Sequence, residues 1–379
     1  MDKRNQDRFA VETILAQAGN RNDGDSRESI STPIYLSSNY RHKDLDDIRN
    51  FDEHKQYSYS RLETPTRKVL SETLATLEHG TQAFALSSGM AAIQLAFSLF
   101  KTGDHIVTLD DLYGGTFRYF DQLDEQYGIR FSKWNGKKLD ELHDLLRPET
   151  RAVWIETPSN PTMKEVDIAA VADMVHAVNP KILVMVDNTF YTPIYQLPLT
   201  QGADIVVHSA TKYLSGHNDL LGGVVVVRGQ GLSEKLSFNY KTTGATLASF
   251  DSWLLLRSLK TLPLRMREHT ANAQKVVSYL KRETQVEKIM YPGKGGMVSF
   301  YVRDEDIIDK MFKRLRVVSF AESLGGVESL LTIPYIQTHR DMEEAERLRL
   351  GITPKLLRLS VGLENAVDLI ADLKQALAQ

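Results

Sequence analysis

The sequence predicts an α/β fold, with a mostly parallel sheet in a large domain and a smaller α+β domain at the C-terminal end. Between about residues 81 and 228, short apolar runs recur without the alternation of a half-exposed strand. Such runs are typical of strands that are buried on both faces. Helical patterns lie between several of the runs, and strands that alternate with helices form a parallel sheet covered by helices. A chain of 379 residues is long enough for two or three domains.

The expected elements follow from these patterns in chain order. Strands are expected at 83–86, 106–109, 152–155, 182–186, 205–207 and 224–227. Apolar residues at helical spacing predict helices at 139–146 and 168–178. After about residue 246 we expect helices at 249–262 and 271–281 and strands at 297–302 and 356–361. An amphipathic helix with Val367, Ile370, Leu373 and Leu377 on one face closes the chain.

Three segments are expected, because charge density and apolar periodicity change along the chain. Residues 1–55 form an N-terminal arm, residues 56–245 the large α/β domain, and residues 246–379 the smaller domain. Residues 41–55 are densely charged and show little apolar periodicity. This part of the arm is either solvated or contacts a neighbouring subunit.

Charge and composition exclude several classes of function. The 46 Lys and Arg residues nearly balance the 49 Asp and Glu residues, so bulk charge gives no reason to expect a nucleic-acid or membrane partner. Cysteine is absent, which excludes disulfides, thiolate zinc sites and cysteine nucleophiles, and no metal site is expected. The polar start lacks the apolar core of a signal peptide. Residues 80–100 are uncharged, but their polar residues and Gly89 favour a strand, a turn and a helix over a membrane span. We therefore expect a cytoplasmic protein.

Residues that could carry chemistry follow three expected strands, where ligands bind in parallel sheets. Ser88 and Gly89 stand between a strand and a helix, where free backbone N–H groups can bind a phosphate. An ordinary N-cap by Ser88 is the structural alternative. Asp187 ends a buried run and needs a cationic partner unless it is a satisfied structural residue. Lys212 follows another run, and desolvation there would make its amine a base or a Schiff-base nucleophile.

These three features together are what pyridoxal 5'-phosphate requires. The lysine holds the aldehyde, the carboxylate keeps the pyridine nitrogen protonated, and the helix end binds the phosphate. The motifs of competing chemistries, GxxxxGK[ST], HExxH, GxSxG and a GxGxxG after a strand, are absent.

Eight motifs in this order resemble the Cys/Met-metabolism family of pyridoxal-phosphate enzymes, which includes cystathionine γ-synthases, γ-lyases and β-lyases. They are YSYSR (57–61), SGMA (88–91), DLYGGT (111–116), ETPSNP (156–161), VDNTF (186–190), SATKY (209–213), AESLGG (321–326) and RLSVG (358–362). The resemblance runs through nearly the whole chain. It implies an aspartate-aminotransferase-like fold and a homo-oligomer, commonly a tetramer built from dimers that share active sites.

The resemblance also implies roles for single residues. Lys212 is similar to the Schiff-base lysine, Asp187 to the partner of the pyridine nitrogen, and Tyr113 to the aromatic residue that stacks on the ring and assists proton transfer. The phosphate cradle corresponds to Gly89, Met90, Ser209 and Thr211. Tyr59 and Arg61 match residues that reach the phosphate of a neighbouring subunit.

The substrate side of the site is implied in the same way. Arg358 matches the residue that grips the α-carboxylate of an amino-acid substrate, together with Asn160 and Ser323. Glu322 matches a position that faces the distal part of the substrate, where a carboxylate can meet the far ammonium of L-cystathionine. Arg118 and Thr338 are further candidates for the pocket.

The activity that the resemblance implies first is that of a cystathionine γ-lyase in transsulfuration, which yields cysteine, 2-oxobutyrate and ammonia, with some β-elimination. The second interpretation is γ-replacement by a cystathionine γ-synthase or O-acetylhomoserine thiolyase. Residues 291–297 (YPGKGGM) run without the longer insertion of many lyases, and with residues 337–339 (QTH) they resemble Firmicute-type γ-synthase and thiolyase relatives. A catalytically silent regulator that binds the cofactor is the alternative from another class.

Overall fold

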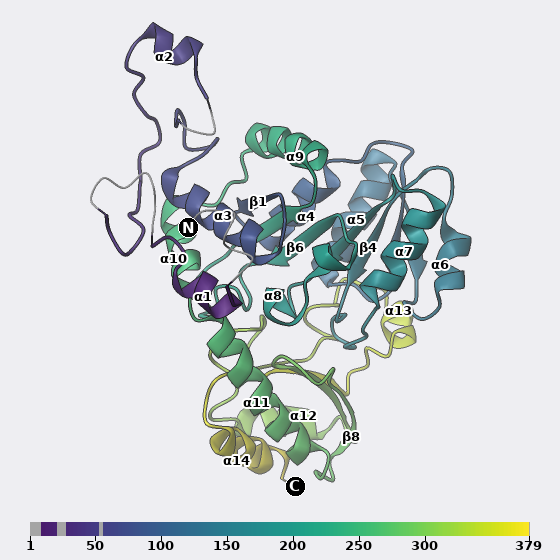
Figure 1. Cartoon of the computed structure of the whole chain (residues 1–379). Helices are drawn as coiled ribbons and strands as arrows, with labels where there is room; N and C mark the ends of the chain where they lie inside the picture. The colour runs from purple at the N-terminus through teal and green to yellow at the C-terminus, as the bar shows by residue number, and fades with distance from the viewer. Residues whose placement is uncertain (1–8, 21–27, 53–55, 379) are drawn as a thin grey trace.

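The computed structural model of the chain describes residues 9–20, 28–52 and 56–378 (Figure 1). These residues form two β-sheets with helices packed around them. The larger sheet has seven strands and the smaller has five. Each sheet contributes to a separate cluster of buried apolar side chains. Within the described residues, no helix combines the length and the apolar character needed to cross a bilayer.

The large sheet is mostly parallel, as predicted. Its strands are β1 (Gln82–Leu86), β2 (His105–Leu109), β3 (Arg130–Trp134), β4 (Thr150–Glu156), β5 (Leu183–Asp187), β6 (Ile205–Ser209) and β7 (Gly223–Val227). They lie in the order β1-β7-β6-β5-β4-β2-β3. Only β7 runs against its neighbours β1 and β6. All six expected strands are present. The unexpected β3 is an edge strand, where exposed Arg130 and Lys133 interrupt the apolar run.

The helices around this sheet begin and end where local chemistry favours it. They are α3 (Pro65–Leu77), α4 (Gly89–Phe97), α5 (Gly114–Tyr127), α6 (Leu139–Leu145), α7 (Ile168–Val178), the short α8 (Thr192–Tyr195) and α9 (Gln230–Thr243), with a 3₁₀ turn at Pro198–Gln201. The Thr64 hydroxyl caps α3, and the Asp167 carboxylate caps α7. Gly128, at a φ of 66°, ends α5 in a left-handed conformation. Residues 80–100 form β1, a turn and α4, as expected.

The smaller sheet is built from β8 (Val286–Met290), β9 (Met297–Val302), β10 (Ser319–Phe320), β11 (Leu330–Thr332) and β12 (Leu356–Ser360). Their order is β10-β11-β12-β9-β8. Helices α12 (Ile307–Arg314) and α14 (Ala366–Leu377) pack against one another beside this sheet, and α13 (Glu344–Arg349) precedes β12. The expected strands β9 and β12 and the closing helix α14 are confirmed.

Two helices connect the sheets, α10 (Ser249–Leu259) and α11 (Leu262–Leu280). The expected start at residue 271 is wrong, because α11 begins at Leu262 with Pro263 in its first turn, a position that favours proline. Leu262 and Met266 belong to the core of the large sheet, whereas Ala273 and Val276 belong to the core of the small one. One helix thus ties both cores together. The expected domain boundaries at 55 and 245 stay predictions.

The N-terminal part of the chain holds two short helices. Leu15 of α1 (Val11–Ala16) is fully buried, and α1 contacts α3 and α11. By contrast, α2 (Leu45–Arg49) has no buried residue and lies in a segment that extends away from the body of the molecule (Figure 1). Leu45 is 68% exposed. Residues 1–8, 21–27 and 53–55 of the predicted arm lie outside the described residues.

Replacing Leu357 by Ala should destabilise the smaller core. Leu357 lies on β12 and has no exposed surface. Truncating a buried leucine costs about 2–5 kcal/mol, because apolar burial is lost and a cavity remains. Urea unfolding should show a clearly lower midpoint for Leu357→Ala. The control Leu348→Ala removes an exposed leucine from α13 and should unfold close to the parent. Equal midpoints for the two variants would contradict this account of the core.

Candidate active site

A cavity of about 330 Å³ lies beside the carboxyl ends of β4, β5 and β6 and also receives side chains from the smaller sheet. It brings together most of the predicted site residues. These are Gly89, Met90, Tyr113, Asn160, Asp187, Ser209, Thr211, Lys212, Glu322, Ser323, Thr338 and Arg358. The cavity also has walls that were not predicted, namely Glu156, Thr189, Phe190 and Leu221 among others.

One wall is the N-terminus of α4. The Ser88 side chain accepts the N–H of Ala91 at 3.0 Å, so the N-cap expected as the structural alternative is present. The N–H groups of Gly89 and Met90 open the helix, where no carbonyl of the same helix can bond them. A Cβ added at Gly89 would lie 2.9 Å from Ser209 Oγ, so only glycine leaves room there. Close backbone approach, free donors and the positive end of a helix suit a phosphate.

Asp187 lies at the end of β5, deep in the cavity, with part of its surface open to it. Its Oδ1 accepts the backbone N–H of Thr189 at 2.9 Å. Removal from bulk water raises the pKa of Asp187, while its bonds to Thr189 and the nearby His208 oppose that shift. Among the described residues, no Lys, Arg or His forms an ion pair with Asp187. A carboxylate in this setting suits a protonated nitrogen from a ligand.

Lys212 follows β6 and extends into the cavity. Its Nζ donates a hydrogen bond to Ser323 Oγ at 2.9 Å. Burial, together with the positive charge of Arg358, lowers the pKa of Lys212 to about 8, against a smaller opposing effect of Glu322. A substantial fraction of the amine is therefore neutral near physiological pH and is available as a base or a nucleophile.

Arg358 reaches the cavity from β12 of the smaller sheet and is only 2% exposed. Its Nη1 donates to Asn160 Oδ1 at 2.9 Å and its Nη2 to the Ser323 carbonyl at 3.0 Å. Burial lowers the pKa of Arg358 to about 10, so it stays charged. Nε has no hydrogen-bond partner among the described residues, and no described carboxylate forms an ion pair with this side chain. A buried guanidinium held by neutral groups is suited to bind an anionic ligand.

Ser323 connects the two cations. It accepts from Lys212 through its hydroxyl and from Arg358 through its carbonyl. Its φ of 91° lies in the region that favours glycine. A non-glycine residue in this conformation costs about 1–3 kcal/mol, and such residues cluster at functional sites.

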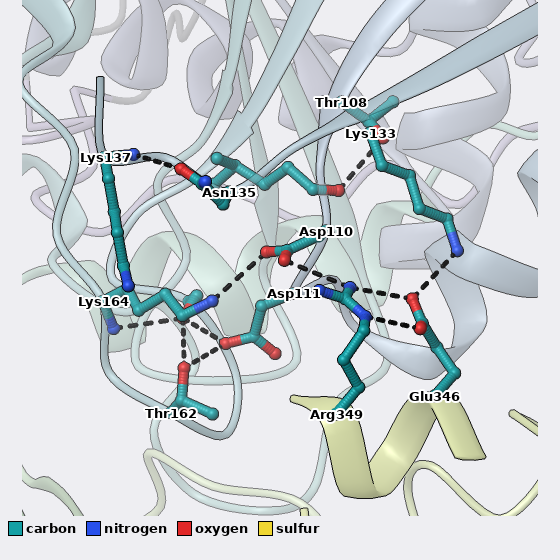
Figure 2. Close-up of polar contacts among 12 residues, drawn as sticks. Thr108, Asp110, Asp111, Lys133, Asn135, Lys137, Thr162, Lys164, Glu346 and Arg349 are labelled. Carbon is teal, nitrogen blue, oxygen red and sulfur yellow. Dashed lines mark hydrogen bonds and ion pairs between the residues drawn. The ribbon is translucent and has the colours of Figure 1, made fainter. Parts of the chain in front are cut away.

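Tyr113 stands at the N-terminus of α5 with its side chain 41% exposed. The loop before Tyr113 is fixed by a polar network that connects the large domain to α13 of the smaller domain (Figure 2). Asp110 accepts from Lys164 at 3.2 Å and from Arg349 of α13 at 3.2 Å. Asp111 accepts from the Ser159 hydroxyl at 2.5 Å and also from Thr162.

Three predicted site residues do not line the cavity. Arg61 donates to the Lys241 carbonyl and lies 5.7 Å from the ring centroid of the half-exposed Tyr59. Arg118 is exposed and pairs with Asp341. The expectation that Tyr59 and Arg61 serve a neighbouring subunit concerns a second copy of the chain and stays a prediction.

Glu156 and Thr189 are cavity residues to which sequence reasoning gave no role. Glu156 ends β4 as Asp187 ends β5, and the two are paired in the sheet register. The rule that singled out Asp187, a carboxylate at the end of a buried strand, would have found Glu156 as well. Thr189 gave no comparable signal, because its contact with Asp187 depends on the turn after β5.

Comparison with known proteins agrees with this geometry. Residues 12–378 match the model of the family described as Cys/Met metabolism PLP-dependent enzyme. The chain is 48% identical to the cystathionine gamma-synthase/O-acetylhomoserine (thiol)-lyase of Bacillus subtilis (strain 168), over 97% of this chain and 96% of the relative. It is 45% identical to the cystathionine gamma-synthase of Haemophilus influenzae (strain ATCC 51907 / DSM 11121 / KW20 / Rd), over 98% of each chain.

A solved structure extends the agreement to the fold. The crystal structure of cystathionine gamma-lyase from Lactobacillus plantarum complexed with L-serine superposes with a TM-score of 0.91 at 40% identity, covering 97% of this chain and 98% of that one. The predicted fold class and cofactor are confirmed. The chain belongs to the Cys/Met-metabolism family of pyridoxal-phosphate-dependent enzymes.

Proposed function

We propose that the chain forms the Cγ–S bond of L-cystathionine by γ-replacement on an O-acylated homoserine, and that it cleaves the same bond by γ-elimination as a second activity. One observation carries this proposal. A single cavity holds a reactive lysine, a guanidinium suited to an α-carboxylate, and a carboxylate, Glu322, suited to a distant ammonium. Cystathionine, which carries an amino-acid group at each end, matches that arrangement.

The residues of the cavity fit the cofactor of the family. The gap that a Cβ at Gly89 would fill, together with Met90, Ser209 and Thr211, would hold the phosphate. Asp187 would meet the pyridine nitrogen, and Lys212 would hold the aldehyde carbon. The bound cofactor supplies an electron-withdrawing ring that accepts the electrons released when bonds at Cα break.

The chain's own groups then divide the work. Arg358 and Asn160 would bind the α-carboxylate and orient the substrate. Once the amine of the substrate has displaced Lys212 from the aldehyde carbon, the freed Lys212 amine would remove the proton from Cα and later one from Cβ, which γ-chemistry requires before the γ-substituent leaves. The Tyr113 hydroxyl would donate a proton to the departing oxygen or sulfur.

The order of the two activities rests on the relatives. Sequence reasoning placed γ-elimination first, but the relatives with 48% and 45% identity are both named as γ-synthases. This supports γ-replacement as the main reaction. The structural similarity to a γ-lyase at 40% identity supports γ-elimination as the second.

We further propose a homo-oligomer, a tetramer built from dimers that share active sites. Tyr59 and Arg61 lie outside the cavity of their own chain, which supports a role at the phosphate of a neighbouring copy. Arg118 and Thr338 remain proposed substrate contacts. A cytoplasmic location remains a prediction from the sequence.

Product analysis of the purified holoenzyme tests the proposed reaction. With O-acetyl-L-homoserine and L-cysteine, mass analysis should show cystathionine and acetate. With L-cystathionine alone, it should show slower release of 2-oxobutyrate and cysteine. The Lys212→Ala variant should form none of these products. Pyruvate and homocysteine as the main products would make the chain a β-lyase, and a holoenzyme that turns over none of the substrates would favour the silent regulator.

Replacing Glu322 by Gln should weaken binding of cystathionine. The carboxylate is partly in water, so its attraction for the distal ammonium is worth about 1 kcal/mol, and KM for L-cystathionine should rise about 3- to 10-fold. The KM for O-acetyl-L-homoserine, which lacks a distal ammonium, should stay within about twofold. Glu328→Gln is the control, because Glu328 is exposed and contacts Asn218 outside the cavity. Equal effects on both substrates would refute this role for Glu322.

The rate at which apoenzyme binds pyridoxal phosphate should depend on the Lys212 amine. Because the pKa of Lys212 is lowered to about 8, half of the amine is neutral at that pH, and the neutral fraction falls steeply below it and can only double above it. The initial rate of covalent attachment, followed by visible absorption, should therefore rise steeply up to about pH 8 and level off near pH 9. A rate that keeps rising to about pH 10, as for an ordinary lysine, would show that burial does not tune this amine.

A further inference from the structure

Glu156 is a buried carboxyl group in the cavity that the proposed chemistry does not use. It ends β4 and is 5% exposed. Its Oε2 accepts the backbone N–H of Tyr113 at 2.7 Å, and its Oε1 faces the indole Nε1–H of Trp154 at 3.3 Å. The Glu156 side chain thus links the end of β4, inside the sheet, to Tyr113, the residue at which the turn into α5 begins.

The ring of Tyr113 is coupled to that turn by close packing. A Cβ added at Gly115 would lie 2.5 Å from the Tyr113 ring and 3.0 Å from Met90 Sδ. A Cβ added at Gly114 would lie 2.0 Å from the Thr338 carbonyl oxygen. The backbone of Gly114 and Gly115 is therefore closely packed between the Tyr113 ring and the smaller domain. Because of this packing, a contact that fixes the backbone of the turn also fixes the position of the ring.

Each residue before Tyr113 already has its own anchor. Asp110 and Asp111 are held by the network of Figure 2. The Leu112 carbonyl accepts from His339 Nε2 at 3.2 Å. Glu156 completes this series at Tyr113 itself, at the point where the loop enters the cavity.

We propose that Glu156 is a positioning residue that fixes Tyr113 over the cavity by accepting its backbone N–H. The inference rests on the proposed role of Tyr113. A neutral acceptor can serve as well as a carboxylate, because burial and the negative charge of Asp187 raise the pKa of Glu156 to about 8. Gln therefore keeps an acceptor for the Tyr113 N–H, with its amide nitrogen at the longer contact to the Trp154 indole, whereas Ala removes the acceptor of both N–H groups.

A double-mutant cycle tests the proposal. Glu156→Ala should lower kcat about 10- to 100-fold, as expected for an unsatisfied buried donor at a catalytic turn, while Glu156→Gln should stay within about threefold of the parent. If Glu156 acts through the ring, Glu156→Ala should change kcat by less than about threefold in a Tyr113→Ala background. Multiplicative losses in the double variant, or an equal loss in Glu156→Gln and Glu156→Ala, would overturn the proposal.

A spectroscopic readout separates positioning from general damage. The visible circular dichroism of the bound cofactor reports the asymmetry of its surroundings, so Glu156→Ala and Tyr113→Ala should change the band in the same way. Asp372→Asn is the control. Asp372 is also a buried carboxylate that accepts backbone N–H groups, from Arg316, Val317 and Val318, but it does not line the cavity. This control should lose stability and keep both the band and kcat.

The two proposals can fail separately. If Tyr113→Ala keeps normal turnover, the proposed role of Tyr113 is wrong. The role of Glu156 is then tested only by the visible circular dichroism band of the bound cofactor. An unchanged band in Glu156→Ala would then overturn the positioning proposal, and a changed band that Glu156→Gln restores would support it.

Discussion

The site depends on two positive side chains that share one cavity, and no carboxylate of the described residues forms an ion pair with either. Lys212 extends from the large sheet and Arg358 from the small one, and Ser323 accepts a hydrogen bond from each. Burial, and to a smaller extent the repulsion from Arg358, lowers the pKa of Lys212 to about 8. A bound anion lowers the free energy of such a site, because a charge removed from water is costly unless it is paired. The phosphate and the amino-acid carboxylate of the proposed function are anions of this kind.

That arrangement requires the two sheets to hold a fixed relation. Arg358 reaches the cavity because β12 brings it against Asn160 of the large domain. Tyr113 is placed by a loop that both domains contact (Figure 2). Asp110 shows how this is achieved, since it accepts from Lys164 of the large domain and from Arg349 of α13. Helix α11 adds an apolar link, because its first turns lie in one core and its last turns in the other. The site is therefore a property of the joined domains.

The sequence pattern predicted those strands and site residues that depend only on burial within the sheet. Six strands of the large sheet are continuous apolar runs because both of their faces are buried, and all six were expected, including β1 at one edge of the sheet. The edge strands β3 and β8 were missed, since Lys133, Glu287 and Lys288 leave no such run. Lys212 and Asp187 were found because a charge after a buried strand is conspicuous. The same rule marks Glu156 as a candidate site residue, but its contact with Tyr113 could not be predicted, because it arises only once β4 and the 110–113 loop come together.

The most direct measurement is to locate the covalent link between cofactor and chain. The holoenzyme would be reduced with borohydride, digested, and its peptides analysed by mass spectrometry. We expect a phosphopyridoxyl group on the peptide that contains Lys212, and none on the peptide that contains Lys294, a lysine outside the cavity that lies over the Tyr191 ring. Modification of a lysine other than Lys212, or no stable link after reduction, would show that the cavity around Lys212 does not hold the cofactor.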